Sequence, residues 1–154
     1  MITIILTFVA AFILTLIPLP AWANAYRPDW IAMVLIYWCL ALPQRINLTT
    51  GFFVGLLIDV MRAELLGIHA LGLVTVAFLT NRSHLRIRMF PWWQQAASVF
   101  LLLLAYRGIV GWVRSLITDV HFDYRYWLPC VIAMLVWPWL FVLLRDLRRY
   151  AKIH

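Results

Sequence analysis

The chain alternates between long apolar runs and short segments that carry its charges. Six main runs contain no Asp, Glu, Lys or Arg, and they cover residues 1–26, 30–44, 46–58, 65–81, 89–106 and 126–144. Long apolar runs of this kind are typical of helices that cross the hydrocarbon layer of a membrane. The pattern therefore predicts an all-α integral membrane protein with a single domain, residues 1–154. Its six transmembrane helices are predicted at about residues 2–19, 29–42, 48–60, 67–80, 92–116 and 126–144.

The basic residues predict the orientation of these helices. If the amino terminus is cytoplasmic, eight cations fall in inner segments: Arg45, Arg82, Arg86, Arg88, Arg145, Arg148, Arg149 and Lys152. Only three fall in outer segments: Arg27, Arg62 and Arg125. Cytoplasmic connections of membrane proteins carry an excess of Lys and Arg. Both termini are therefore predicted to be cytoplasmic.

The first apolar run has a second interpretation. Ala21-Trp22-Ala23 resembles a small-x-small cleavage site, which would make the run a signal peptide. However, no Lys or Arg precedes the run, and it is longer than the usual apolar region of about 7–15 residues. A retained helix is the favoured interpretation, and either choice leaves the other five spans with the same orientation.

The second and third spans are short for a bilayer. Thirteen uncharged residues at 1.5 Å each reach about 20 Å, against roughly 30 Å of hydrocarbon. We expect these helices to be shielded by longer neighbours and to sit in a locally thinner bilayer.

The carboxyl-terminal segment 145–152 carries four cations and one acid. It is predicted to leave the membrane as a helix. Its cations are expected to meet anionic lipid headgroups, at about 1 kcal/mol for each cation near the surface.

Composition excludes several functional classes. The chain is 66% apolar and 12% charged, whereas a soluble domain has about 25% charged residues. A net charge of +7 would suit nucleic acid, but the cations lie at the predicted membrane borders and not along one polar face. Cys39 and Cys130 lie in apolar runs and are predicted to be packing residues. No metal-ligand spacing, phosphate-binding glycine loop or nucleophile motif is present, so no metal, cofactor or enzymatic activity is expected.

Asp59 is the most unusual acid, because it lies inside an apolar span. It is ten residues past Thr49, or about 15 Å along the helix, while Arg107 lies about 21 Å past Trp93 from the same side. An Asp59–Arg107 pair is therefore possible, and Arg62 competes because it shares a helical face with Asp59. Two interpretations stay open: a proton or ligand site, or a pair that locks two helices together. The structural interpretation is favoured.

Gly51 and Gly55 form a G-x-x-x-G step in the third span. Small residues four apart let two helix backbones approach closely in a membrane. Packing within this chain is favoured over packing against a partner helix. Four other glycines suit the same explanation: Gly67, Gly72, Gly108 and Gly111.

Several ordered motifs together resemble one family. They are Arg27-Pro28-Asp29-Trp30, Tyr37-Trp38, Leu40-Ala-Leu-Pro-Gln-Arg-Ile-Asn47, Thr50-Gly51-Phe52, Gly55, Asp59, Leu66-Gly67, Trp137-Pro-Trp-Leu-Phe141 and Leu144-Arg145. This series resembles the MreD family of rod shape-determining proteins. The resemblance is dense from about residue 27 to 80 and looser from about 91 to 145.

The resemblance implies a non-enzymatic subunit of the bacterial elongasome. Such a protein is a multi-pass protein of the cytoplasmic (inner) membrane that helps organise lateral peptidoglycan synthesis and rod cell shape. MreC is the implied direct partner, while RodA, a class B penicillin-binding transpeptidase and MreB belong to the same assembly. The implied fold is similar to the substrate-binding subunits of energy-coupling-factor transporters. Residues expected to serve architecture or partner contact are Arg27, Pro28, Asp29, Trp30, Gly51, Gly55, Asp59 and Arg107.

An alternative function is a membrane carrier or binding subunit for a small molecule or a lipid-linked substrate. The transporter-like fold and the expectation that Asp59 is buried motivate this alternative. A polar cavity beside Asp59 would favour the carrier, whereas an interior filled by Trp and Leu would favour a scaffold.

Overall fold

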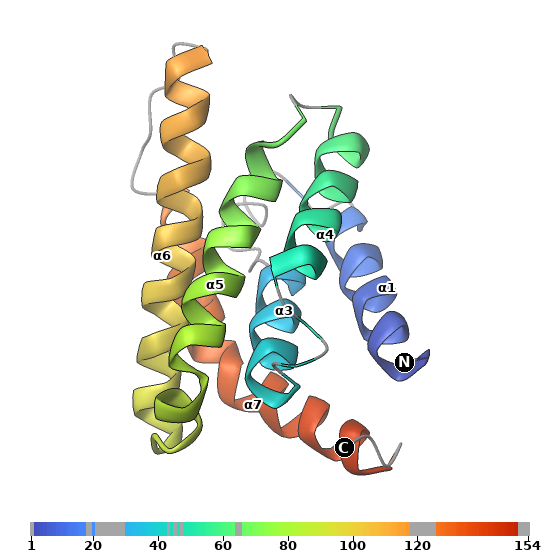
Figure 1. Cartoon of the computed structure of the whole chain (residues 1–154), viewed down its shortest axis with the longest axis vertical. Helices are drawn as coiled ribbons and strands as arrows, with labels where there is room; N and C mark the ends of the chain where they lie inside the picture. Colours follow the sequence, from blue (N-terminus) through green and yellow to red (C-terminus); the bar gives the residue numbers. More distant parts are fainter. Residues whose placement is uncertain are drawn as a thin grey trace.

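The computed structural model describes residues 2–17, 20, 30–42, 44, 46, 48–63, 66–117 and 126–150. Within these ranges the chain forms helices and no strands (Figure 1). The helices are α1 (Ile2–Leu16), α3 (Trp30–Ala41), α4 (Leu48–Met61), α5 (Ile68–Arg88), α6 (Trp92–Ile117) and α7 (Leu128–Tyr150). The predicted all-helical class is therefore confirmed, and each of the six described helices overlaps a range predicted as a span.

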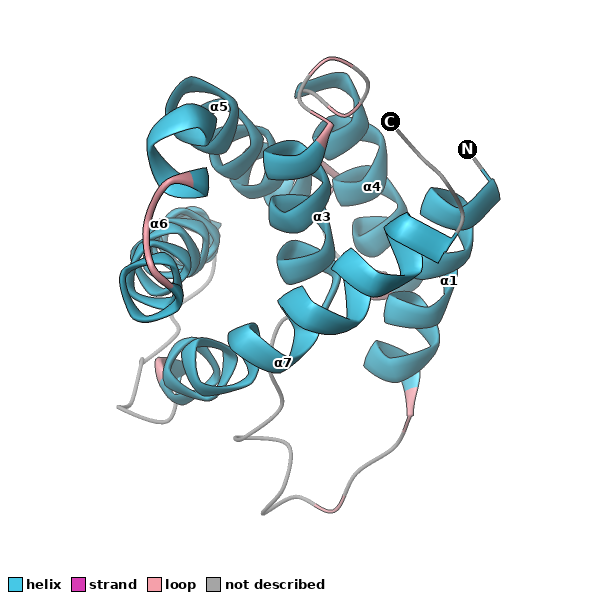
Figure 2. Ribbon diagram, turned by 90° about the horizontal axis from the view of Figure 1, so that it is seen from below, coloured by secondary structure: helices cyan, strands magenta, loops and turns pink. Residues whose placement is uncertain are grey.

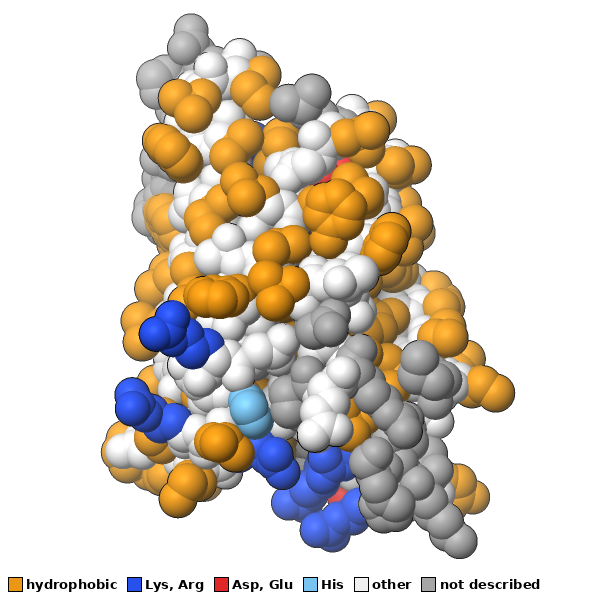
Figure 3. All heavy atoms as spheres, viewed as in Figure 1, with side chains coloured by type: hydrophobic (Ala, Val, Ile, Leu, Met, Phe, Trp, Pro, Cys, Tyr) orange, Lys and Arg blue, Asp and Glu red, His pale blue; other side chains and the backbone are white. Residues whose placement is uncertain are grey.

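Successive helices run in opposite directions along the bundle (Figure 1). As a result, the first residues of α1, the connection between α5 and α6, and the last turns of α7 lie at the same end of the molecule. Arginine side chains gather at this end, and many hydrophobic side chains lie on the visible surface above them (Figure 3). We call it the basic end; its described arginines are Arg82, Arg86, Arg88, Arg145, Arg148 and Arg149.

Two of the described helices, α6 and α7, are long and apolar enough to cross a membrane. Helices α1, α3 and α4 are apolar but have only 15, 12 and 14 residues. The shortest, α3, is also the central one, because every residue from 31 to 40 is buried. A helix that is apolar on all sides must be shielded from water, by neighbouring helices or by lipid. The expected shielding of this short span by longer neighbours is thus what the structure has.

Buried indole N–H groups connect α3 and α7 to their neighbours. Trp38 donates to the hydroxyl of Thr7 at 2.9 Å, which joins α3 to α1. Trp137 donates to the side-chain carbonyl of Gln95 at 3.2 Å, which joins α7 to α6. A buried polar group without a partner is costly, so each bond favours one arrangement of its helix pair over sliding alternatives.

The G-x-x-x-G step packs α4 against α5. A Cβ atom at Gly55 would overlap the backbone Cα of Ala70 and lie 2.5 Å from its amide nitrogen. A Cβ at Gly51 would lie 3.0 Å from the carbonyl oxygen of Leu73. The predicted packing within the chain is therefore confirmed, and these two glycines face a helix of their own bundle.

The same explanation holds for one further glycine and fails for two. A Cβ at Gly72 would lie 2.7 Å from the ring of Tyr106, so this glycine brings α6 close to α5. At Gly67 and Gly108 a Cβ would meet nothing within 4 Å, and the prediction of close packing is wrong there. Gly67 has a φ of +106°, so it serves backbone conformation instead.

Two helices extend beyond their predicted spans at the basic end. The fourth span is predicted to end at about residue 80, but α5 continues to Arg88, because no Pro or Gly interrupts it before Pro91. Helix α7 continues to Tyr150 and contains Pro138. Its last turns cross the end of the bundle past α3 and run toward the α1 side (Figure 2).

Replacing Gly55 with Ala should destabilise the bundle, because the new methyl group meets backbone atoms that cannot rotate away. Overpacking of this kind costs about 1–3 kcal/mol, so the apparent melting temperature in detergent should fall by about 5 °C. Gly108→Ala is the matched control on α6: it meets open space and gains helix propensity of up to about 1 kcal/mol. Equal melting temperatures for the two variants would contradict the α4–α5 contact.

Candidate functional site: a buried carboxylate at a helix junction

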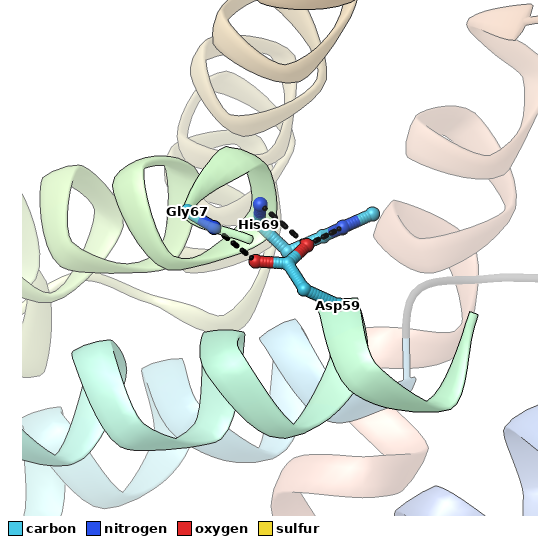
Figure 4. A network of polar contacts seen from close by, with 3 residues as sticks. All are labelled: Asp59, Gly67 and His69. Atoms are coloured by element: carbon cyan, nitrogen blue, oxygen red, sulfur yellow. Dashed lines mark hydrogen bonds and ion pairs between the residues drawn. The ribbon is translucent and has the colours of Figure 1, made fainter. Parts of the chain in front are cut away.

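Asp59 lies in the last turn of α4 and is completely buried, with 0% of its surface exposed. Its side chain points toward the start of α5, across the turn that joins the two helices (Figure 4). The turn needs unusual backbone angles, a φ of +53° at Ala63 and +106° at Gly67. This geometry returns the chain tightly enough for α5 to begin beside the carboxylate.

Three N–H groups donate hydrogen bonds to the carboxylate. The backbone N–H of Gly67 lies 2.8 Å from Oδ2. The backbone N–H of His69 lies 3.1 Å from Oδ1, and Nδ1 of the His69 ring lies 2.7 Å from the same oxygen. Both oxygens of Asp59 are thus engaged, by the cap residue Gly67 directly before α5 and by His69 in its first turn.

This arrangement caps α5 with a side chain supplied by α4. The first N–H groups of a helix have no partner within the helix, and a helix N-terminus carries partial positive charge. The residue at the cap position of α5 is Gly67, which has no side chain to satisfy these groups. Asp59 accepts from two of them, so its negative charge and the positive end of α5 stabilise each other.

The His69 ring extends the junction to α6. Its Nδ1 must carry the proton that Asp59 accepts, which leaves Nε2 on the other side of the ring. The His69 and Tyr106 rings lie 6.2 Å apart between centroids. Tyr106 also packs over Gly72, one turn further along α5. Asp59, His69 and Tyr106 therefore lie together where α4, α5 and α6 meet.

The junction has the geometry of a structural site. A carboxylate that accepts three hydrogen bonds in a fully buried position has no exposed oxygen to offer a ligand. The nearest cavity that we describe, about 240 Å³ between α1, α3 and α4, is lined by Ile58, Met61 and Arg62 but not by Asp59. Within the described ranges, no group of three His, Cys, Asp or Glu residues could hold a metal ion.

The two cations considered as partners of Asp59 lie elsewhere. Arg107 donates to the backbone carbonyl of Tyr126 at 2.9 Å, and the Tyr126 hydroxyl donates to the Arg107 carbonyl at 2.6 Å. The guanidinium also lies 5.0 Å from the centroid of the Tyr126 ring, so Arg107 holds the start of α7 against α6. Arg62 is exposed in the turn after α4. The structure thus gives Asp59 a partner, His69, that was not among the two considered.

The remaining sequence-predicted residues divide into two groups. Arg27, Pro28 and Asp29 lie outside the described residues, so their predicted roles stay predictions. Trp30 is the first residue of α3, half-buried and packed against the core. Cys39 and Cys130 are buried free thiols, as predicted for packing residues.

Sequence reasoning missed His69 because only permanent cations were considered as partners for Asp59. A signal was present. Gly67 places a predicted helix N-terminus within ten residues of Asp59, and such a terminus attracts a carboxylate without any cation. The Trp137–Gln95 bond had no comparable signal, since the two residues are 42 positions apart.

The fold and the junction define a helical membrane protein whose buried polar groups serve packing. Two comparisons give the family. The family model described as rod shape-determining protein MreD matches residues 1–147. A Haemophilus influenzae protein named "Rod shape-determining protein MreD" is 34% identical over 152 residues, which cover 99% of this chain and 94% of that protein. No solved structure matches the chain.

The chain therefore belongs to the MreD family, and the predicted resemblance is confirmed. Members of this family are membrane proteins that determine cell shape and act as structural proteins, not as enzymes. A role in rod cell shape follows for this chain, and a structural reading of the Asp59 junction agrees with it.

Replacing Asp59 with Asn should lower the yield of folded protein and its melting temperature. An amide cannot accept three hydrogen bonds in this geometry, so at least one buried N–H loses its partner, at about 1–3 kcal/mol. His69→Ala removes only the ring bond and should cost less than Asp59→Ala, which removes all three. Detergent extraction followed by thermal unfolding measures both effects.

The control for this series is Asp146→Asn, since Asp146 is exposed on α7 and lies 3.8 Å from Arg145. It should leave the melting temperature unchanged. A stable, fully assembled Asp59→Asn protein that has lost its cell-shape function would instead support a proton or ligand site.

Proposed function

We propose that this chain is a multi-pass scaffold of the bacterial cytoplasmic membrane that docks the transmembrane helix of MreC. The single observation that carries this proposal is the junction at Asp59, whose carboxylate accepts three hydrogen bonds from within the chain. The one acid buried among the described helices thus holds α4 and α5 together. A protein whose buried polar groups are engaged in its own packing is suited to present a fixed surface.

The proposed topology has six spans with the basic end in the cytoplasm. The alternating helix directions and the arginines at one end support it. The short helices α1, α3 and α4 fit a compact six-helix plan like that of the substrate-binding subunits of energy-coupling-factor transporters.

The proposed docking place for MreC is the groove between α1 and α4. Its cavity of about 240 Å³ is lined mainly by apolar side chains, among them Phe12 and Leu16 of α1 and Met61 of α4. Helix α1 contacts α3 along the bundle, and its opposite face is apolar and exposed. Gly51 and Gly55 face α5, as favoured from the sequence, so the proposed partner surface does not include them. Side-chain packing would supply the affinity, since lipid tails give two apolar helices no hydrophobic drive to associate.

RodA, the class B penicillin-binding transpeptidase and MreB belong to the same proposed assembly. In this arrangement the chain helps to position the enzymes of lateral peptidoglycan synthesis. It supplies rigidity and binding surface, and its partners supply the chemistry.

The carrier alternative required a polar cavity at Asp59. The carboxylate instead contacts Gly67 and His69 on both oxygens, and the cavity of about 240 Å³ between α1, α3 and α4 is not lined by Asp59. No observation at this junction favours a carrier, so the scaffold is the function that we propose.

Cysteine accessibility tests the proposed topology. The native Cys39 and Cys130 are buried, which gives a low labelling background. Leu66→Cys, at the end away from the arginines, and Leu85→Cys, at the basic end, replace side chains that are 63% and 67% exposed. A membrane-impermeant maleimide added to spheroplasts should label only the Leu66→Cys protein, and should label both after permeabilisation. Labelling of Leu85→Cys in intact spheroplasts would overturn the proposed orientation.

Filling the groove should weaken MreC binding. Thr15→Trp places a large ring in the cavity between α1 and α4, and we expect about tenfold less chain recovered with tagged MreC from detergent, the equivalent of about 1.4 kcal/mol. Thr75→Trp on α5 is the matched control: both hydroxyls donate to the carbonyl four residues earlier, at 2.8 and 2.9 Å. Thr75 lies outside the groove, so its variant should bind normally.

Two results would count against docking. If tagged MreC recovers its other partners but never the wild-type chain, the scaffold proposal fails. If the chain is recovered but both tryptophan variants bind equally well, MreC binding stands and the groove is the wrong place.

A further inference from the structure

Two adjoining cavities form a cleft at the basic end, between α3, α5, α6 and α7. The larger has a volume of about 370 Å³ and the smaller about 100 Å³. Four residues line both: Arg88, Gln95, Phe141 and Arg145. We call the two cavities together the basic cleft.

The cleft contains polar groups that the protein leaves unsatisfied. Tyr37 is 1% exposed and lines the smaller cavity, and its hydroxyl has no hydrogen-bond partner among the described residues. The buried Nε of Arg145 has none either, since the carboxylate of Asp146 is 3.8 Å away, too far for a hydrogen bond. Native proteins seldom leave buried polar atoms unpaired, so each such atom calls for an explanation.

The charge of the cleft selects an anion. Arg88, Arg145 and Arg148 are among its lining residues, and no acid lines either cavity. Gln95 gives its side-chain carbonyl to Trp137, which leaves its amide N–H groups as further donors. Arginine forks and neutral N–H or O–H donors together suit the several oxygens of a phosphate group.

The sequence spacing on α7 explains how the arginines reach one place. Phe141, Arg145 and Arg148 follow each other at four and three residues, so they share one helical face. That face turns toward α3, because Phe141 packs edge-on against Tyr37 at 5.6 Å between ring centroids. Pro138 lies just before this segment, where a proline can bend the helix across the end of the bundle.

The walls of the larger cavity are apolar, which indicates a ligand with a tail. Its other lining residues are Phe90, Trp92, Trp137, Pro138 and Val142. Trp92 and Val142 are also exposed on the outer surface of the bundle, so the cleft adjoins the surface that faces lipid in the proposed topology. Trp92 is at the level where tryptophan rings anchor helices to the membrane border. Free phosphate would use the arginines and leave these walls without a role.

We propose that the basic cleft binds an anionic phospholipid of the cytoplasmic leaflet. Arg88, Arg145, Arg148 and the Tyr37 hydroxyl hold the phosphate, and the first part of an acyl chain packs against Trp137 and the neighbouring apolar wall. Basic pockets between transmembrane helices on this side of a membrane are suited to such headgroups. The assignment of the leaflet rests on the proposed topology, whereas the binding itself does not.

Binding can be measured on the full-length chain purified in detergent. Phosphatidylglycerol added in mixed micelles should raise the melting temperature in a saturable manner, and phosphatidylcholine should not. Arg148→Gln should raise the half-saturating phosphatidylglycerol concentration about tenfold, because it removes charge-assisted hydrogen bonds. Arg149→Gln is the matched control: it removes the adjacent charge from the same helix but lines neither cavity, and it should leave the concentration unchanged.

A second pair of variants separates weaker lipid binding from a loss of folding in Arg148→Gln. Tyr37→Phe removes only a hydroxyl that has no hydrogen-bond partner among the described residues, and it should weaken phosphatidylglycerol binding several-fold while the lipid-free melting temperature is kept. Tyr150→Phe, on an exposed ring at the end of α7, should change neither quantity.

Three outcomes would overturn the proposal. If Arg148→Gln and Arg149→Gln weakened phosphatidylglycerol binding equally, the lipid would be attracted to a charged surface and not to a defined site. A phosphatidylglycerol response that inorganic phosphate reproduces and saturates would identify a free anion as the ligand. No difference between Tyr37→Phe and Tyr150→Phe would exclude the hydroxyl. These measurements are made in micelles, so they do not depend on the orientation of the chain in a membrane. If labelling in spheroplasts contradicts the proposed topology, the result for lipid binding still stands.

Discussion

The bundle depends on a carboxylate that meets the positive end of a helix away from water. In a low-dielectric interior, the charge of Asp59 and the unsatisfied N–H groups at the start of α5 would each be destabilising. The hydrogen bonds between them remove both costs. The junction fixes the return angle of the chain between α4 and α5. That angle in turn brings Gly51 and Gly55 against the backbone of α5. Close packing along the whole helix pair therefore follows from one turn and one side chain.

Other polar pairs repeat this logic on the remaining helices. Two buried hydrogen bonds, Trp38–Thr7 and Trp137–Gln95, would each break if one helix slid along the other. Apolar helices in lipid otherwise have little to distinguish one register from another, since lipid tails and side chains are equally apolar. Specific polar pairs thus fix the helix register, which hydrophobic burial helps to fix in the core of a water-soluble protein. A family of structural proteins needs such a definite shape more than it needs reactive groups.

The sequence predicts the helices well because the apolar runs and their charged borders have a direct physical cause in the membrane. It also favours packing of Gly51 and Gly55 within the chain, because small residues four apart let helix backbones approach closely, but it does not name α5 as the helix they contact. It is less informative about where helices end in polar surroundings: α5 passes through Asn81 and Arg82 without a break. Partners of buried groups are harder still. The His69 contact depends on backbone angles at Ala63 and Gly67, and the unpaired Tyr37 hydroxyl depends on how α7 crosses α3.

Unequal helix lengths give the bundle two different sides. Helices α1 and α4 have 15 and 14 residues, or about 22 Å of rise, whereas the 26 residues of α6 span about 39 Å. In the proposed six-span topology, a bilayer about 30 Å thick must compress beside the first pair and can stretch, or let the helix tilt, beside the second. Elastic energy then accumulates in a rim of lipid along one flank of the molecule. In that topology, a protein that replaced the rim would relieve the stress, so the bilayer itself would favour assembly on the α1–α4 flank.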